Sequence, residues 1–173
     1  MRWALLLTWL MALLPVAGPA QAGDAPRLQI NLDTFDAMKR VVELPSGMHL
    51  AYVEWGSADG PPVVLIHGYT DSARDWVPLL PYLTGRRLIA VDIRGHGQSA
   101  KPECCYARID FAYDIKLLLD HLNISQADII GHSLGSMIAQ VFAESWPERT
   151  RRVVLISSTA GPPDGVRPRK PKD

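Results

Sequence analysis

The chain has 173 residues, of which 18 are basic and 18 acidic, so its formal net charge is zero. This length is typical of one globular domain. The balanced charge gives no electrostatic reason to expect a nucleic-acid partner. The two cysteines, Cys104 and Cys105, lack the spacing of a metal site, so we expect neither a metal nor another cofactor.

The first 22 residues have the pattern of a secretory signal peptide. Met1-Arg2 supplies a positive start, residues 3–14 are apolar and uncharged, and Ala20-Gln21-Ala22 fits a cleavage site. We therefore expect an exported protein, periplasmic or secreted, that is cleaved after Ala22. An uncleaved N-terminal anchor is the alternative, although the apolar run is short for a stable membrane span. The polar residues 23–36 predict an irregular lead-in.

Cys104 and Cys105 are direct neighbours in the chain. Export permits a disulfide, and a bond between adjacent cysteines would be strained and therefore easier to reduce. A vicinal disulfide and two free thiols on a surface loop both remain open from the sequence alone.

Hydrophobic patterning predicts a β-hairpin followed by buried strands. Residues 38–44 and 48–55 alternate partly between apolar and polar side chains, and a Pro-Ser-Gly turn joins them. Short apolar runs that predict strands buried on both faces follow at residues 63–66, 88–91, 129–130 and 153–156.

Segments with helical spacing separate these strands. In residues 72–83 the apolar side chains of Trp76, Leu79, Leu80 and Leu83 recur on one face, which predicts a helix. Two further helices are expected at residues 110–122 and 134–146, the second ending before a proline.

This order predicts an α/β fold: a mainly parallel sheet with an N-terminal antiparallel hairpin and helices on both faces. Right-handed crossovers bring the loops that follow the parallel strands to one edge, where such folds build their sites. The predicted domain spans residues 37–160. Residues 161–173, rich in Pro, Lys and Arg, predict a disordered tail.

Three loops at that edge contain residues suited to chemistry. His67-Gly68-Tyr69 follows the first parallel strand, and Asp-Ile-Arg-Gly-His-Gly-Gln-Ser at residues 92–99 follows the next. Gly131-His132-Ser133-Leu134-Gly135 lies between a predicted strand and a predicted helix. Its G-x-S-x-G pattern is typical of a nucleophile elbow, a tight turn that exposes the serine hydroxyl beside a helix N-terminus.

In this order and spacing the three loops resemble those of the α/β-hydrolase superfamily. The resemblance extends from the hairpin to Ser158, the N-terminal part of that fold. It implies that Ser133 is the nucleophile and that the backbone N–H groups of Leu134 and Tyr69 form the oxyanion hole. It also implies that Asp92 and Arg94 support their loop by hydrogen bonds without entering the chemistry.

A serine at the elbow implies acyl transfer on a small carbonyl substrate such as an ester or a lactone. Relatives with aspartate at this position, such as dehalogenases and epoxide hydrolases, attack carbon centres instead. The resemblance therefore favours the serine-nucleophile, esterase- and peroxidase-like branch of the superfamily. His132 is expected to point away from Ser133, because neighbouring side chains diverge in a tight elbow.

The same resemblance leaves the catalytic base unassigned. The fold places the triad in the order serine, acid, histidine, yet every histidine here precedes Ser133: His49, His67, His96, His121 and His132. Asp164 is the candidate for the acid.

The sequence therefore predicts either a C-terminally truncated hydrolase or an inactive binding remnant, and complementation by a separate fragment is a third alternative. Residues 153–156 would then form an unpaired apolar edge through which the chain could self-associate.

Overall fold

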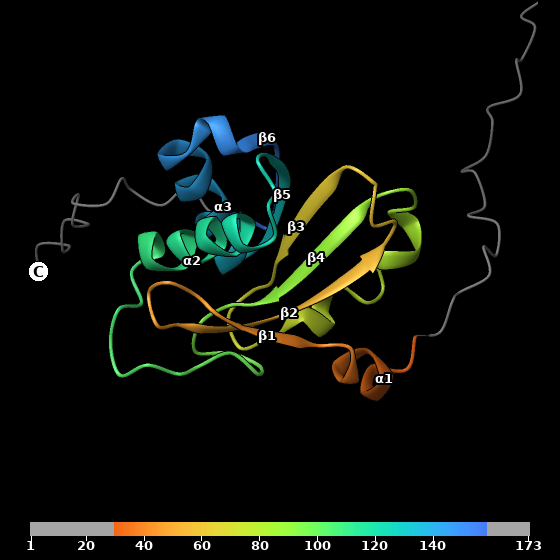
Figure 1. The fold of residues 1–173 in the computed structure, drawn as a ribbon, viewed down its shortest axis with the longest axis horizontal. Helices are drawn as coiled ribbons and strands as arrows, with labels where there is room; N and C mark the ends of the chain where they lie inside the picture. The colour runs from red at the N-terminus through yellow and green to blue at the C-terminus, as the bar shows by residue number, and fades with distance from the viewer. Residues whose placement is uncertain (1–29, 159–173) are drawn as a thin grey trace, which may run out of the picture.

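The computed structural model describes residues 30–158, which form a six-stranded sheet of order β1-β2-β4-β3-β5-β6 (Figure 1). The strands are β1 (Arg40–Glu43), β2 (His49–Gly56), β3 (Pro62–Ile66), β4 (Arg87–Asp92), β5 (Ala127–His132) and β6 (Thr150–Ile156). β2 pairs antiparallel with β1 and β4, and the remaining pairs are parallel. The predicted α/β class, the hairpin and the parallel strands are confirmed.

Three α-helices and three short 3-10 turns accompany the sheet. They are α1 (Leu32–Ala37), α2 (Arg108–His121), α3 (Leu134–Ser145), η1 (Ala73–Trp76), η2 (Leu80–Tyr82) and η3 (Pro147–Arg149). The helices predicted at 110–122 and 134–146 correspond to α2 and α3, and Pro147 follows α3 as expected. Figure 1 shows α2 and α3 together on one side of the sheet.

The central strands are buried on both faces because their side chains alternate between two cores. In β3, Val64 and Ile66 pack into the core beneath α2 and α3, whereas Val63 and Leu65 pack into the core on the opposite face. Burying one such side chain contributes about 1.5–3 kcal/mol. The apolar runs at residues 63–66, 88–91 and 129–130 therefore mark the middle of the sheet. The prediction that residues 153–156 are buried on both faces is wrong, because β6 is an edge strand and pairs only with β5 in the described sheet.

The two faces are covered by different kinds of structure. Ile115 of α2 and Phe142 of α3 fill the first core. Phe35 of α1, Trp76 of η1 and Leu80 of η2 fill the second. Helical structure therefore covers both faces, as predicted, but on the second face it is short.

The prediction of one helix over residues 72–83 is wrong. The segment forms the separate turns η1 and η2 instead. Pro78 and Pro81 have no backbone N–H to donate and their rings crowd the preceding turn, so a continuous α-helix cannot form. The predicted apolar face survives, since Trp76 and Leu80 are buried.

The lead-in predicted over residues 23–36 contains a helix, so the prediction of an irregular segment is wrong for residues 32–36. α1 begins after Asn31, whose side-chain oxygen accepts hydrogen bonds from the N–H groups of Asp33 and Thr34. Phe35 anchors this short helix, because its side chain is fully buried. Residues 1–29 and 159–173, with the predicted signal peptide, the predicted tail and Asp164, lie outside the described residues.

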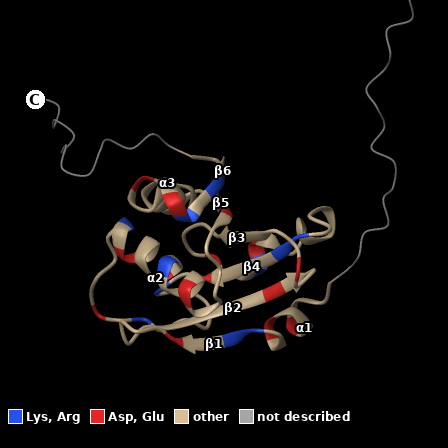
Figure 2. Cartoon of the chain, turned by 45° about the horizontal axis from the view of Figure 1, so that its top comes forward, with Lys and Arg blue, Asp and Glu red and all other residues tan. Residues whose placement is uncertain are grey.

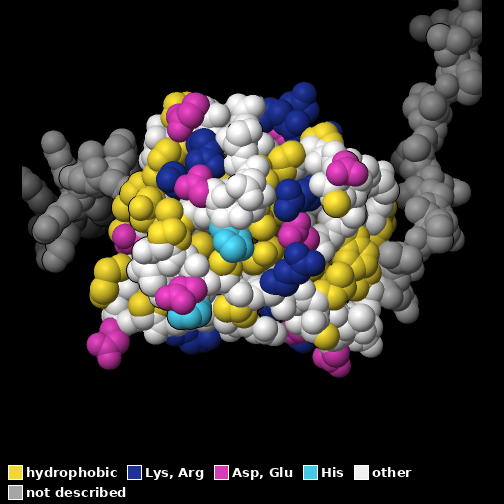
Figure 3. All heavy atoms as spheres, viewed as in Figure 1, with side chains coloured by type: hydrophobic (Ala, Val, Ile, Leu, Met, Phe, Trp, Pro, Cys, Tyr) yellow, Lys and Arg dark blue, Asp and Glu magenta, His cyan; other side chains and the backbone are white. Residues whose placement is uncertain are grey.

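Charged side chains of both signs are distributed over the described surface (Figure 2). The face seen in Figure 3 likewise intersperses basic, acidic and apolar groups. Within residues 30–158 no helix combines the length and the apolar character that crossing a bilayer requires.

Candidate active site

Ser133 lies in the tight turn between β5 and α3. Its backbone torsions, φ 50° and ψ −114°, are rarely adopted by residues other than glycine. The flanking glycines permit the turn: a Cβ at Gly131 would clash with the carbonyl of Gly135, and a Cβ at Gly135 would clash with the carbonyl of Ile66. The G-x-S-x-G spacing thus reflects close backbone packing against the end of β3.

Two hydrogen bonds hold this turn. The N–H of Ser133 donates to the carbonyl oxygen of Ile156 at 2.9 Å, and the hydroxyl of the buried Ser136 donates to the carbonyl oxygen of Ser133 at 2.6 Å. The Ser133 hydroxyl itself has no hydrogen-bond partner among residues 30–158. The turn is therefore fixed by its backbone while its hydroxyl remains available.

The loop after β3 runs directly beside the elbow. A Cβ added at Gly68 would lie 3.3 Å from the Cβ of Ser133, so only a small residue fits there. Tyr69 follows, with 72% of its surface exposed. Within residues 30–158, neither the N–H of Tyr69 nor that of Leu134 has a protein acceptor.

A pocket of about 670 Å³ opens between this loop, the loop after β4 and the start of α3. Its lining is mainly aromatic and apolar, and His96 contributes an imidazole ring to it. The lining residues are Tyr69, Thr70, Gly95, His96, Tyr106, Phe111 and Leu134. The structure therefore brings Tyr69 and Leu134 to the lining of the same pocket.

Asp92 holds the loop after β4 from a fully buried position. One carboxylate oxygen accepts hydrogen bonds from Lys39 Nζ at 2.7 Å and from the N–H of Gln98 at 2.8 Å. The other accepts from the N–H of Ala73 at 2.7 Å. All these partners belong to the scaffold, so Asp92 has the predicted supporting role.

Arg94 connects the same loop to α2. Its guanidinium forms two hydrogen bonds of 2.7 Å with the carboxylate of Asp114, and both side chains are buried. These bonds raise the pKa of Arg94. Burial raises the pKa of Asp114, and the charge of Arg94 opposes that effect. The pair is structural, in agreement with the sequence analysis.

His67 is buried and fully engaged. Its Nδ1–H donates to the carbonyl oxygen of Gly68 at 2.7 Å, and its Nε2 accepts from the N–H of Ile93 at 3.1 Å. Burial lowers the pKa of His67 and outweighs the opposing effects of the Gly68 carbonyl and Asp92. A neutral ring with both nitrogens occupied cannot serve as a base.

The other histidines are also not positioned to act as the base for Ser133. His132 points toward Asp75, whose carboxylate accepts a hydrogen bond from Nδ1 at 3.1 Å, so it diverges from Ser133 as predicted. His96 donates from Nδ1 to the carbonyl oxygen of Arg94 at 2.9 Å. His49 and His121 are exposed on the hairpin and at the end of α2.

The structure contains a disulfide between Cys104 and Cys105, so of the two alternatives left open by the sequence it has the vicinal disulfide.

Tyr106 and Phe111, close to this disulfide in the chain, line the pocket, and neither was predicted as a site residue from the sequence. Tyr106 lies in the loop after β4 and Phe111 in the first turn of α2, and this closeness to a loop at the site edge of the sheet was the available signal. Among residues 30–158, no group of three or more His, Cys, Asp and Glu side chains could hold a metal ion.

This geometry agrees with the comparison to known proteins. Residues 61–171, more than half of the chain, match the family described as alpha/beta hydrolase fold. The chain belongs to that family.

The relatives include proteins with named activities. The chain is 38% identical over 120 residues to a non-heme chloroperoxidase from Streptomyces lividans, covering 68% of this chain and 44% of that one. It is 34% identical over 148 residues to the bifunctional epoxide hydrolase 2 of Mus musculus, covering 83% of this chain and 26% of the relative. The chain thus spans less than half the length of either relative.

Solved structures of hydrolases also superpose on this chain over part of their length. Epoxide hydrolase A from Mycobacterium thermoresistibile superposes with a TM-score of 0.69 at 33% identity, over 75% of this chain and 41% of that one. A hydrolase from Pseudomonas aeruginosa PA01 superposes with a TM-score of 0.66 at 33% identity, over 68% and 44%.

Proposed function

We propose that Ser133 is the nucleophile of a serine hydrolase that transfers the acyl group of an ester, lactone or related small carbonyl substrate. The backbone conformation of Ser133 is the observation that carries this proposal. Such a conformation is energetically costly and is concentrated at functional sites. It presents the hydroxyl directly before the first residue of α3, where the helix dipole favours developing negative charge.

The oxyanion hole is proposed to consist of the backbone N–H groups of Leu134 and Tyr69. Both residues line the pocket, and both N–H groups lack a protein acceptor within residues 30–158. Attack on a carbonyl places negative charge on its oxygen, and one preorganised donor at that position contributes about 3–4 kcal/mol to the transition state. The aromatic ring of Tyr69 is incidental to this role.

Serine at the elbow favours acyl transfer over epoxide opening, although epoxide hydrolases are among the relatives. A carboxylate that attacks an epoxide carbon forms an ester, which water can cleave. A serine hydroxyl attacking the same carbon would form an ether, which water does not cleave. With an acyl substrate, Ser133 instead forms an ester that can turn over.

None of the histidines within residues 30–158 is positioned as the base for Ser133. All five histidines lie within the described residues, and none hydrogen bonds to the Ser133 hydroxyl. A serine without a base is a poor nucleophile. We propose that a segment corresponding to a region of the longer relatives supplies the histidine and its acid partner.

A second candidate is a protein that keeps the pocket but performs no chemistry. The unpartnered hydroxyl of Ser133 favours this candidate, because an active triad holds its serine by a hydrogen bond to histidine. It predicts a folded chain that binds small apolar carbonyl compounds and never becomes acylated.

Export belongs to the same proposal. The N-terminal pattern ending at Ala22 and the Cys104–Cys105 disulfide both suit an oxidising compartment outside the cytoplasm. The mass of the exported protein, expressed with its native N-terminus, should correspond to a chain that begins at Gly23.

Acylation by a short-chain aryl ester tests the proposed nucleophile. Peptide mass spectrometry of the mature chain, after incubation with imidazole as a substitute base, should find the acyl group on Ser133. Ser133→Ala should abolish it, whereas Ser145→Ala, which removes an exposed serine at the end of α3, should not. An acyl group spread equally over other serines, or none at all on a folded chain, would favour the non-catalytic candidate.

A further inference from the structure

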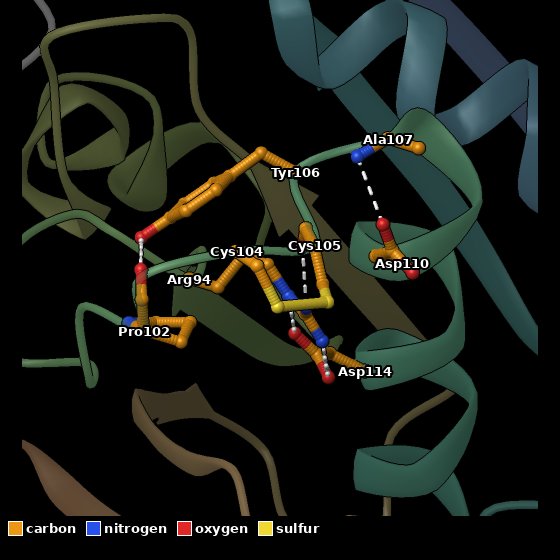
Figure 4. The surroundings of a disulfide bond; sticks show 8 residues. All are labelled: Arg94, Pro102, Cys104, Cys105, Tyr106, Ala107, Asp110 and Asp114. Atoms are coloured by element: carbon orange, nitrogen blue, oxygen red, sulfur yellow. Dashed lines mark hydrogen bonds and ion pairs between the residues drawn. A yellow bond between two sulfur atoms is a disulfide. The ribbon is translucent and has the colours of Figure 1, made fainter.

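The loop between β4 and α2 is closed on itself by a side chain. The hydroxyl of Tyr106 donates to the carbonyl oxygen of Pro102 at 2.7 Å. The Cys104–Cys105 disulfide lies in the middle of this short closed loop. Figure 4 shows the Tyr106 side chain extending toward Pro102. The conformation of the two cysteines therefore decides whether the Tyr106 hydroxyl can reach its acceptor.

The disulfide is also connected to the scaffold. Nη1 of Arg94 donates to the carbonyl oxygen of Cys105 at 2.5 Å, and the same guanidinium is held by Asp114 of α2 (Figure 4). Cys105 has a φ of 70°, a left-handed conformation that is disfavoured for residues other than glycine. The loop would leave this conformation once nothing constrained it.

Tyr106 forms one wall of the pocket beside Leu134. Its ring packs directly on the backbone of Gly95, where an added Cβ would come within 2.7 Å of the ring carbon Cε1. The ring centroid lies 6.0 Å from that of Phe111, another lining residue. A shift of Tyr106 would therefore change the width of this pocket.

The loop has room to move. A second cavity, of about 370 Å³, lies beside it and is lined by Met48, Pro102, Cys104 and Cys105, among others. Both cysteines are exposed, so a small dithiol can reach the sulfur atoms. Exposed disulfides are the ones that are commonly labile.

We propose that Tyr106 determines the size of the group accepted by the pocket beside Leu134, and that the Cys104–Cys105 disulfide holds Tyr106 in its narrow position. Reduction releases the Cys105 backbone, breaks the contact of Tyr106 with Pro102 and widens the pocket. This inference rests on the proposed function for its substrate class, a small carbonyl compound. It assigns the disulfide a role in selectivity in addition to stability.

The reduction requires a dithiol as the electron donor. One thiolate of the reductant attacks a cysteine sulfur, forms a mixed disulfide and displaces the other cysteine as a thiolate. The second thiol of the reductant then displaces the first cysteine and closes the reductant's own disulfide. In total two electrons and two protons pass to the protein, which gains two thiols.

Binding of two unreactive ketones, acetophenone and the bulkier benzophenone, tests the inference without requiring turnover. Dissociation constants are measured by NMR titration of the oxidised and of the dithiothreitol-reduced chain. Reduction should raise the affinity for benzophenone relative to acetophenone by about fivefold or more. Hydrogen exchange of residues 102–107 should accelerate in parallel.

Three variants complete the test. Cys104→Ser/Cys105→Ser should show the selectivity of the reduced chain and should not respond to dithiothreitol. Tyr106→Ala should bind benzophenone more tightly relative to acetophenone in both redox states. Tyr106→Phe keeps the ring but loses the hydrogen bond to Pro102, so its relative affinity should lie between those of the wild type and Tyr106→Ala. The inference would be overturned if reduction left the ratio of the two ketone affinities unchanged, or if the double-serine variant responded to dithiothreitol as the wild type does. Because both ketones are unreactive and the readout is binding alone, the test does not depend on acylation of Ser133, and failure of the proposed chemistry is recognised separately.

Discussion

The N–H of Ser133 donates a hydrogen bond to the carbonyl oxygen of Ile156, the last residue of β6, at 2.9 Å. This bond joins the strained turn of the elbow to a strand at the edge of the sheet. The costly backbone conformation of Ser133 persists because surrounding structure holds it in place. The geometry of the candidate nucleophile therefore depends on β6 as well as on its own motif.

Gly135→Ala should destabilise the elbow strongly, because the added methyl group would clash with the backbone carbonyl of Ile66. We expect a loss of about 3 kcal/mol in the free energy of unfolding, measured by urea denaturation. The matched control is Gly47→Ala in the hairpin turn, where φ is +79° and no atom lies within 4 Å. That variant should lose only about 1 kcal/mol. Equal losses of unfolding free energy in the two variants would show that the close contact between Gly135 and the Ile66 carbonyl does not limit the residue at this position.

Asp114→Asn should be costly because it leaves the buried guanidinium of Arg94 without a charged partner. Breaking such a pair from one side costs about 3–5 kcal/mol. Lys116→Ala is the control, since it breaks the more exposed ion pair with Asp120 on the same helix and should cost about 0.3–0.5 kcal/mol. Thermal or urea unfolding of the two variants measures the difference. If the two losses were alike, Arg94–Asp114 would not fix the loop to α2.

Acidification should destabilise the fold through His67. Burial lowers the pKa of His67 in the folded state, so the unfolded chain binds the proton first, near the ordinary value of about 6.5. The free energy of unfolding should be constant above this pH. Below this pH the free energy of unfolding should decrease by up to about 1.4 kcal/mol per pH unit, until the pKa of His67 in the folded state is reached.

His67→Gln provides the control for the pH dependence. This variant should be less stable at neutral pH, because it loses the ring whose two nitrogens hydrogen bond to the Gly68 carbonyl and the Ile93 N–H. Its stability should nevertheless change less between pH 6.5 and 5, because one proton no longer binds on unfolding. An unaltered slope would assign the titration to another group.

The exposed end of β6 should promote self-association. Val154, Leu155 and Ile156 are between 37 and 47% exposed, and in the described sheet β6 pairs only with β5. Unpaired apolar edges favour strand pairing between molecules. Leu155→Lys should reduce concentration-dependent association in sedimentation velocity, whereas Ile109→Lys, on an exposed apolar site of α2, should not. A wild-type chain that stays monomeric at every concentration would contradict this expectation.

Sequence patterns predicted the parts of the fold that depend on local chemistry. The apolar runs marked β3, β4 and β5 because strands covered on both faces need continuous apolar residues. The run at residues 153–156 also located β6, but this strand lies at the sheet edge and its side chains are largely exposed. The G-x-S-x-G spacing located the elbow because only glycine fits its close backbone contacts. The helical spacing of Trp76 and Leu80 was misleading, since buried 3-10 turns can present the same spacing as a helix when prolines interrupt it.

Long-range pairs could not be predicted in this way. Asp75 and His132 are 57 positions apart, and Lys39 and Asp92 are 53 apart. Neither pair belongs to a spacing pattern, because the contact arises only when the sheet brings distant loops together. The supporting role of Asp92 followed from the family resemblance, while its partners became visible only in the structure.

Fluorophosphonate labelling with and without imidazole tests the central claim most directly: Ser133 is a nucleophile for which no histidine within residues 30–158 is positioned as the base. Labelling of the folded chain, mapped by peptide mass spectrometry, should be slow alone. It should accelerate at least about tenfold with added imidazole, which can substitute for a missing general base, and it should be absent in Ser133→Ala. Rapid labelling of Ser133 without imidazole would contradict the missing base, and no labelling under either condition would contradict the nucleophile.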